Sequence, residues 1–136
     1  MVVPRVDQTY YELLGGEDGL RAVVDDFYDL MSLDERFAGI RAMHPQDLST
    51  SRDKLFWFLS GWLGGPPLFE EKFGHPRLRA RHLPFAIGVS ERDQWMTCMT
   101  ECLEKSPISE ATRRALIDAL FKTADWMRNK DVEQNV

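Results

Sequence analysis

The sequence predicts an all-α protein, and three observations support this. Apolar residues recur with the 3.6-residue period of a helix, no segment alternates as a strand does, and glycine and proline pairs separate the periodic segments. The chain of 136 residues is long enough for one domain with one core. We therefore expect a single domain over residues 1–136, with a short N-terminal extension at 1–10 and a short C-terminal tail at 129–136.

The first half of the chain predicts two helices and a connector. A short helix in YYELLGGEDGL ends at Gly15 and Gly16, and a longer helix follows over residues 17–31. The apolar face of the longer helix carries Leu20, Val23, Val24, Phe27 and Met31, and its polar face carries Arg21, Asp25, Asp26 and Asp29. The connector that follows contains one short helical piece and stops at Pro45.

A third helix is predicted to begin near Ser49 or Thr50 and to end at GGPP, residues 64–67. Its apolar face carries Leu55, Phe58, Leu59 and Trp62. The next stretch, residues 66–84, is long and weakly regular, with one short helix from Pro76 to about His82. Loops of this length are usually functional or disordered.

Two more helices complete an expected total of five or six. One begins around Ser90 and Asp93 and carries Trp95, Cys98, Met99, Cys102 and Leu103 on one face. The last begins near Ser109 and buries Leu116, Leu120, Ala124 and Met127. Cys98 and Cys102 are four residues apart, and a disulfide between them would close almost no loop, so we expect two reduced, half-buried packing residues.

Composition excludes several classes of protein. The net charge of -5 argues against non-specific nucleic-acid binding, and no apolar run approaches the ~20 residues that span a bilayer. The N-terminus lacks the apolar core of a signal peptide, so we expect a cytoplasmic protein.

The aromatic content is high for a plain helical bundle, with four tryptophans and eight phenylalanines in 136 residues. A flat apolar guest would account for it. HExxH and paired CxxC motifs are missing, which leaves zinc little support, whereas haem needs only one strong axial ligand. His75 and His82 would lie ~10 Å apart on one helix, so they could not bind the same iron. His82 is the better candidate, although a surface or core histidine is the commoner case for either.

Three other residues are candidates with ordinary alternatives. Tyr28 and Trp95 lie on apolar faces, and each carries one polar group that needs a partner when buried. A backbone carbonyl could satisfy Tyr28, and ordinary core packing could account for Trp95. Ser51 lies one turn before Leu55 and also reads as a helix-start residue.

Four stretches together carry a specific resemblance: LGGEDGLRAVVDDFY, GGPP, GHPRLRARHLPF and ERDQWM. With a tryptophan thirteen residues after the histidine of RHLPF, the chain resembles a group II truncated haemoglobin over roughly residues 11–127. The resemblance implies a two-over-two helical sandwich around haem b, with His82 as the proximal iron ligand. Tyr28, His44, Ser51, Leu55 and Trp95 match positions on the side of the haem where the gas binds. Phe58, Phe69 and Phe85 are expected to contact haem, and Lys54 and Arg81 to pair with its propionates.

This resemblance predicts reversible binding of O₂, with CO and NO as further ligands. Tyr28, Trp95 and the His44 N–H would provide up to three hydrogen-bond donors, and His44 should make ligand kinetics vary between about pH 5 and 8. Three donors exceed what simple delivery needs, which leaves open an enzyme that detoxifies NO or acts as a peroxidase, or a gas or redox sensor. A haem-free helical interaction module is a third alternative. An unidentified reductase and a second copy of the chain remain open as partners.

Overall fold

A computed structural model describes residues 8–130 of the chain, and every described regular element is a helix. The elements are α1 (Tyr10–Leu13), α2 (Gly16–Leu33), the 3₁₀ helix η1 (Glu35–Phe37), α3 (Ala38–Arg41), α4 (Ser49–Trp62), α5 (Leu68–Phe73), α6 (Leu78–His82), α7 (Val89–Glu104) and α8 (Glu110–Trp126). The predicted all-α class is confirmed. The expected five or six helices are too few, because this part of the chain holds eight α-helices and one 3₁₀ helix.

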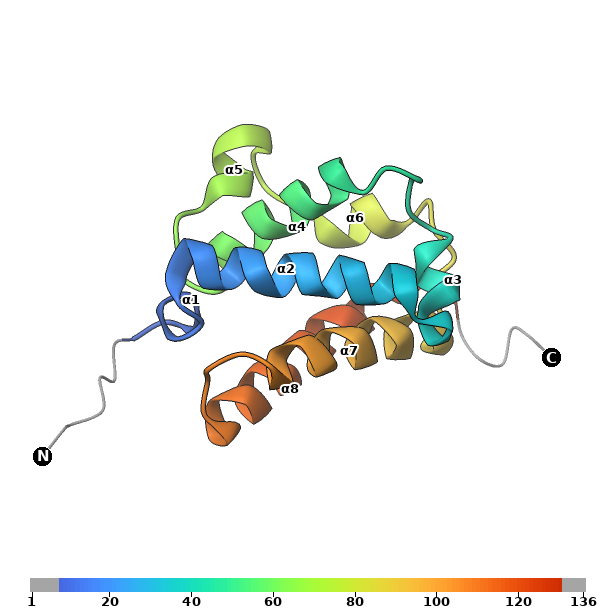
Figure 1. Ribbon diagram of the computed structural model, residues 1–136. Helices are drawn as coiled ribbons and strands as arrows, with labels where there is room; N and C mark the ends of the chain where they lie inside the picture. Colours follow the sequence, from blue (N-terminus) through green and yellow to red (C-terminus); the bar gives the residue numbers. More distant parts are fainter. Residues whose placement is uncertain (1–7, 131–136) are drawn as a thin grey trace, which may run out of the picture.

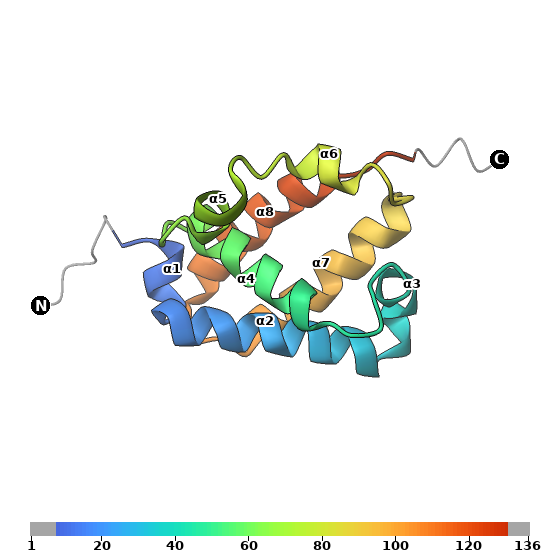
Figure 2. The ribbon, with the colours of Figure 1, turned by 90° about the horizontal axis from the view of Figure 1, so that it is seen from above.

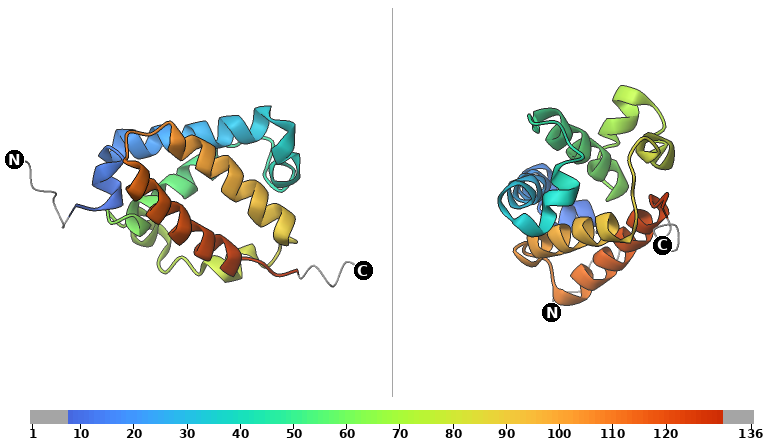
Figure 3. Two further views of the ribbon diagram at one scale, coloured as in Figure 1. Left: turned by 90° about the horizontal axis from the view of Figure 1, so that it is seen from below. Right: turned by 90° about the vertical axis from the view of Figure 1, so that its right-hand side faces the viewer.

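Four long helices form two crossed layers. Helices α2 and α4 lie above α7 and α8 in Figure 1, and the view from above shows the two pairs crossing (Figure 2). From below, α7 and α8 lie side by side, with α2 crossing behind them (Figure 3). The short helix α6 lies on the opposite side of the molecule from α2, and α3 closes one end (Figure 2). This is the expected two-over-two sandwich.

The helical period of α2 explains why this helix forms the centre of the core. Its predicted apolar face is buried in full, and Leu20, Val24 and Phe27 have no exposed surface. They pack against buried residues of α7, which are Met96, Cys98, Met99, Cys102 and Leu103. Burial of this apolar area is the main favourable term in folding.

Glycines allow the tight connection between α1 and α2. Gly15 has a φ of 105°, in the left-handed region where a side chain is strained. A Cβ on Gly19 would collide with the Leu14 carbonyl group. The chain can therefore reverse beside α2 only with glycine at these two positions.

The structure corrects three local predictions. A helix, α5, lies in the stretch expected to be irregular, and α6 begins at Leu78 rather than Pro76. The start of α7 is Val89, where the Glu91 carboxylate accepts a hydrogen bond from the Gly88 N–H at 2.7 Å. This interaction caps the helix in place of Ser90 and Asp93.

On α4 the most buried aromatic residue is Phe56, 3% exposed, which lies outside the predicted apolar face. Leu55, Phe58 and Trp62 of that face are only half-buried. Helix α4 thus packs one face against α2 and turns a second apolar face toward the space above α6.

The cysteines are more buried than expected. Cys98 and Cys102 are 0% and 1% exposed and are free thiols. The Cys98 thiol donates to the Phe27 carbonyl oxygen at 3.3 Å, which joins α7 to α2. They are fully buried core residues rather than half-buried ones.

Backbone hydrogen bonds join the first and last described segments to the rest of the domain. The Tyr11 N–H donates to the Leu63 carbonyl, so α1 is tied to the end of α4. Asn129 and Lys130, which were expected in a free tail, both donate from the backbone to the Ile87 carbonyl. The remaining parts of the expected extension and tail, residues 1–7 and 131–136, lie outside the described residues. Within the described part, no helix combines the length and apolarity that a bilayer crossing requires.

Candidate haem pocket

The short helix α6 fixes one histidine in a defined protonation state. The His82 Nδ1 atom lies 2.6 Å from the Leu78 carbonyl oxygen, one turn earlier. Because a carbonyl can only accept, Nδ1 carries the hydrogen, and the lone pair of a neutral ring is then on Nε2. The structure gives Nε2 no partner among residues 8–130. This is the state in which an imidazole binds a metal, with its other nitrogen held by a carbonyl.

The residue that was the rival candidate, His75, lies outside α6. It is exposed, and its Nδ1 accepts a hydrogen bond from the Arg77 N–H at 3.1 Å. An Nδ1 that accepts requires the hydrogen of a neutral ring to be on Nε2, which leaves no free lone pair for a metal. His82 is therefore the better placed imidazole of the two.

The segment that follows His82 is tied to the end of α8 by one side chain. The Asn129 amide nitrogen donates to the carbonyls of Phe85 and His82 at 2.7 and 3.3 Å. Its carbonyl oxygen accepts from the Ile87 N–H at 2.9 Å. The position of His82 thus depends on α8 as well as on its own short helix.

Aromatic residues of α2 and α7 and one histidine in the turn after α3 form a cluster. The ring of Phe27 lies 5.1 Å from that of Tyr28 and 5.2 Å from that of Trp95. The Tyr28 ring is also in edge contact with the His44 ring, at 5.6 Å between centroids. Phe27 therefore sets the spacing between two side chains that each carry one hydrogen-bond donor.

Both donors lack a protein acceptor. Among residues 8–130 the structure gives no hydrogen bond to the Tyr28 hydroxyl or the Trp95 N–H, although Tyr28 is only 5% exposed. No fully buried side-chain nitrogen or oxygen in that range is without a partner, so these two groups border open space. Burial raises the pKa of the Tyr28 hydroxyl, an effect that Arg52 partly offsets. Tyr28 therefore keeps its proton at neutral pH and stays a donor.

His44 differs from the expected third donor. Its Nδ1 lies 2.8 Å from the Ile40 carbonyl oxygen, so Nδ1 carries the hydrogen. Burial is the main cause that lowers the pKa of His44 below its usual 6.5, and the nearby Arg41 and His82 add to it. The ring is neutral at pH 7, and its Nε2 offers a lone pair instead of an N–H. The pH range in which His44 should affect ligand kinetics, expected at about pH 5 to 8, therefore moves to lower pH.

A cavity of about 860 Å³ lies between α4, α5, α6 and α8. Its apolar walls include Phe58 and Trp62 of α4, Phe69 of α5, Leu78 of α6 and Met127 of α8. This volume is within the usual range for sites of small molecules and cofactors. His82, Leu55 and the donors Tyr28 and Trp95 do not line the cavity, but Leu55 lies one turn before Phe58 on the half-buried face of α4.

These features fit a large flat apolar guest with one axial ligand. One imidazole presents a free lone pair, aromatic side chains border a large cavity, and two donors face open space without a protein acceptor. Within residues 8–130, no group of three or more His, Cys, Asp or Glu residues could hold a metal ion. A single-histidine haem site matches this set of donors better than a site that needs several protein ligands.

The remaining expected haem contacts lie at the edge of this region. Phe69 is buried, 6.5 Å from Phe58 between ring centroids, while Phe85 is 42% exposed. The Arg81 guanidinium lies over the Phe69 ring, and its Nε donates to the Pro76 carbonyl at 2.7 Å. The side chains of Lys54 and Ser51 make no hydrogen bond among the described residues, and Lys54 is exposed. Lys54 and Arg81 thus lie on the two helices, α4 and α6, that flank the region.

Sequence reasoning missed two residues that position this site, Arg52 and Asn129. Both act through partners 23 to 47 positions away in the chain, so no local pattern reveals them. A weak signal for Arg52 exists, because Asp25 and Asp29 are spaced one turn apart on α2 and can face one cation.

Comparisons with known proteins agree with this geometry. Residues 9–129 match the family model described as bacterial-like globin. The chain is 39% identical over 123 residues to the group 2 truncated hemoglobin YjbI of Bacillus subtilis, covering 88% of each chain.

Solved structures show the same similarity. A cold-adapted truncated hemoglobin from Pseudoalteromonas haloplanktis superposes with a TM-score of 0.88 at 46% identity, covering 90% of this chain and 99% of the other. A truncated oxygen-avid haemoglobin from Bacillus subtilis superposes with a TM-score of 0.80 at 37% identity, covering 90% and 100%.

Proposed function

Since this chain belongs to the bacterial-like globins and is a group II truncated haemoglobin with a haem-binding, gas-binding role, we propose that it binds O₂ reversibly on haem b. Haem, when bound, supplies the iron that takes a diatomic gas and shifts negative charge onto O₂. In this proposal His82 Nε2 is the proximal ligand. Phe58, Phe69 and Phe85 contact the ring system, and Lys54 and Arg81 lie where they can meet its carboxylates.

The observation that carries the proposal is the pair of donors without acceptors. Tyr28 O–H and Trp95 N–H come from different helices and are joined by contact with the same Phe27 ring. A hydrogen bond to a charged acceptor contributes about 1.5–3 kcal/mol, so a ligand that carries negative charge and accepts from both donors is favoured. O₂ accepts such bonds when it carries negative charge, whereas CO is less polar and gains less. The pocket therefore favours O₂ over CO and slows its release.

Ser51 and Leu55 complete the gas side in this proposal. Both lie on the half-buried face of α4, one turn apart. Ser51 is small and leaves room beside the gas, and Leu55 excludes water from it. Exclusion of water strengthens the hydrogen bonds from Tyr28 and Trp95, because the local dielectric constant is low. The similarity to an oxygen-avid haemoglobin supports slow release of O₂.

The same donors favour one second candidate. Two strong donors exceed what simple delivery requires, and they would also polarise peroxide or hold O₂ for reaction with NO. An enzyme that turns over NO or peroxide with a reductase is therefore the alternative. The cytoplasmic location and a second copy of the chain as partner stay predictions.

The deciding experiment is the visible absorption spectrum of the purified protein in its ferric, ferrous and CO-bound forms. A five- or six-coordinate haem spectrum that shifts with CO is expected, together with a stable complex in air-saturated buffer after reduction. Failure to retain haem after reconstitution would instead support a haem-free interaction module. Measurable turnover of NO or peroxide with an added reductant would favour the enzyme over the reversible binder.

A further inference from the structure

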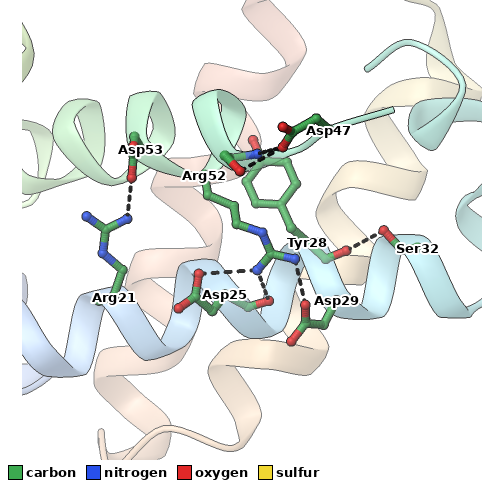
Figure 4. Close-up of polar contacts among 9 residues, drawn as sticks. Arg21, Asp25, Tyr28, Asp29, Ser32, Asp47, Arg52 and Asp53 are labelled. Carbon is green, nitrogen blue, oxygen red and sulfur yellow. Dashed lines mark hydrogen bonds and ion pairs between the residues drawn. The ribbon is translucent and has the colours of Figure 1, made fainter. Parts of the chain in front are cut away.

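Arg52 is the one described residue that connects the gas-side helix α4 to both turns of α2 that flank Tyr28. Its Nη2 donates to the Asp29 carboxylate at 2.6 Å. Its Nη1 donates to the Asp25 carboxylate and to the Asp25 backbone carbonyl, both at 3.2 Å. Figure 4 shows the side chain extending from α4 to α2 alongside the Tyr28 ring. Asp25 and Asp29 lie three residues before and one residue after Tyr28. The bonds from Arg52 to these two residues, called the clamp below, therefore span the turn of α2 that carries Tyr28.

The guanidinium also contacts the tyrosine itself. Its central carbon lies 5.8 Å from the Tyr28 ring centroid, at the outer limit of a cation–π contact. Phe27 and His44 contact the same ring edge-on. On the backbone side, the Ser32 hydroxyl donates to the Tyr28 carbonyl at 2.9 Å. Arg52 is thus the contact through which α4 limits the movement of a ring whose hydroxyl has no bond of its own.

A second ion pair across the same helices provides a comparison. Arg21 on α2 donates to Asp53 on α4 at 3.0 Å, and its guanidinium lies 4.0 Å from the Phe56 ring centroid (Figure 4). This pair joins α2 and α4 as Arg52 does, but it makes no polar or ring contact with Tyr28. The Arg52 side chain is 26% exposed and the Arg21 side chain 37%. The two pairs therefore separate a general role in joining helices from a specific role at Tyr28.

We propose that Arg52 is a positioning residue for gas binding, which holds the Tyr28 hydroxyl where it donates to O₂. The inference rests on the proposed function and adds a residue outside the pocket to it. Without the clamp, the turn of α2 that carries Tyr28 and the ring itself have more freedom. The hydroxyl then spends less time in the donating position. The complex with O₂, which needs the hydrogen bond, is therefore weakened, whereas the complex with CO changes little.

The test compares three single variants, Arg52→Met, Arg52→Lys and Arg21→Met. Tyr28→Phe and the double variant that combines it with Arg52→Met are measured beside them. Dissociation rates of O₂ and CO are measured on the haem-loaded proteins by stopped flow. The C–O stretching band of the CO form and the thermal unfolding midpoint are measured in parallel. The band reports donation from Tyr28 without any turnover, and the midpoint reports the general effect of losing an ion pair.

Arg52→Met should speed O₂ release at least about fivefold, the effect of weakening one ordinary hydrogen bond, and change CO release much less. Its C–O band should broaden toward that of Tyr28→Phe. Arg52→Lys should recover part of the effect, and Arg21→Met should lower the midpoint without changing the O₂-to-CO ratio. In the Tyr28→Phe background, Arg52→Met should leave the ratio unchanged, because the bond it acts through is gone.

Four results would overturn the proposal. An equal change in O₂ and CO release would make Arg52 a structural residue only. An undiminished effect in the Tyr28→Phe background would place its action elsewhere. If Tyr28→Phe alone leaves the ratio unchanged, the proposed role of Tyr28 fails, and that of Arg52 fails with it. A normal Tyr28→Phe effect with a silent Arg52→Met overturns only the role of Arg52.

Discussion

The His82 Nδ1 atom lies 2.6 Å from the Leu78 carbonyl oxygen, and this contact determines which nitrogen is free. Since Nδ1 donates to the carbonyl, the ring cannot turn Nδ1 toward the pocket without losing that bond. The contact lies within one turn of a five-residue helix, so the imidazole and its orienting group move together. The consequence for iron binding can be measured directly.

His82→Gly should lose haem or bind it weakly, because no other described histidine on α6 can replace the lost ligand. Added imidazole should restore the absorption spectrum by occupying the vacated space. His75→Ala is the matched control, since His75 is exposed and its Nδ1 is engaged by Arg77. Unchanged haem retention and a normal ferrous-CO spectrum in His82→Gly would rule out the assignment.

Tyr28→Phe and Trp95→Phe should each speed O₂ release and change CO release much less. Losing one hydrogen bond in a dry site costs about 1–3 kcal/mol, or roughly 5- to 150-fold. The double variant should be non-additive, because the two donors share one acceptor. Stopped-flow dissociation on wild type and the three variants is the measurement. If both gases change by the same factor, the residues act by shape alone.

O₂ release should slow as the pH falls below the usual histidine pKa of 6.5, because protonation gives His44 a second N–H. The window lies below 6.5 because burial lowers the pKa of His44. Arg41 is the nearby permanent charge that also lowers this pKa, and His44→Phe should remove the dependence while retaining Arg41. A wild-type profile that stays flat below pH 6.5 would show that His44 does not control ligand release.

The same shift affects stability with a defined sign. The folded state disfavours the charged imidazole, so the unfolded state binds more protons below pH 6.5. The free energy of unfolding should therefore decrease as the pH falls through 6.5 and below. The decrease should be smaller in His44→Phe, as measured by urea unfolding at several pH values.

Asn129→Ala should lower the free energy of unfolding by about 1–3 kcal/mol and speed haem loss, because three hydrogen bonds between the segment after α8 and residues 82–87 disappear. Asn129→Asp keeps the acceptor for Ile87 N–H and should have a smaller effect. Transfer of haem to an excess of a second apoglobin gives the rate. Equal haem loss in wild type and Asn129→Ala would show that α6 alone fixes His82.

Periodicity predicted what local sequence determines. The face of α2 from Leu20 to Met31 and that of α7 from Cys98 to Leu103 were correct, because the residues of each recur at helical spacing. Helix α5 was missed because six residues after two prolines are too few to show a period. Phe56 was missed because α4 has two apolar faces, and a single-face pattern selects the wrong one.

For the site, the residues that a family resemblance can identify differ from the contacts that only the structure reveals. The resemblance identified His82, Tyr28 and Trp95, and these roles stay predictions. The orienting contacts could not be predicted, because they join distant segments: Arg52 to Asp29, Asn129 to His82 and Cys98 to Phe27. The protonation state of His44 required a carbonyl position, that of Ile40, which no sequence pattern specifies.

The two buried thiols between α2 and α7 can report how often these helices separate. Cys98 and Cys102 expose at most 1% of their surface, so an alkylating reagent cannot reach them while the two helices are in contact. The hydrogen bond with Cys102, together with burial, raises the pKa of Cys98, which keeps this thiol in its unreactive form. Phe27, which accepts from Cys98, also separates Tyr28 from Trp95. The rate at which these thiols are alkylated therefore measures how often α2 and α7 separate beside the proposed gas-binding residues Tyr28 and Trp95.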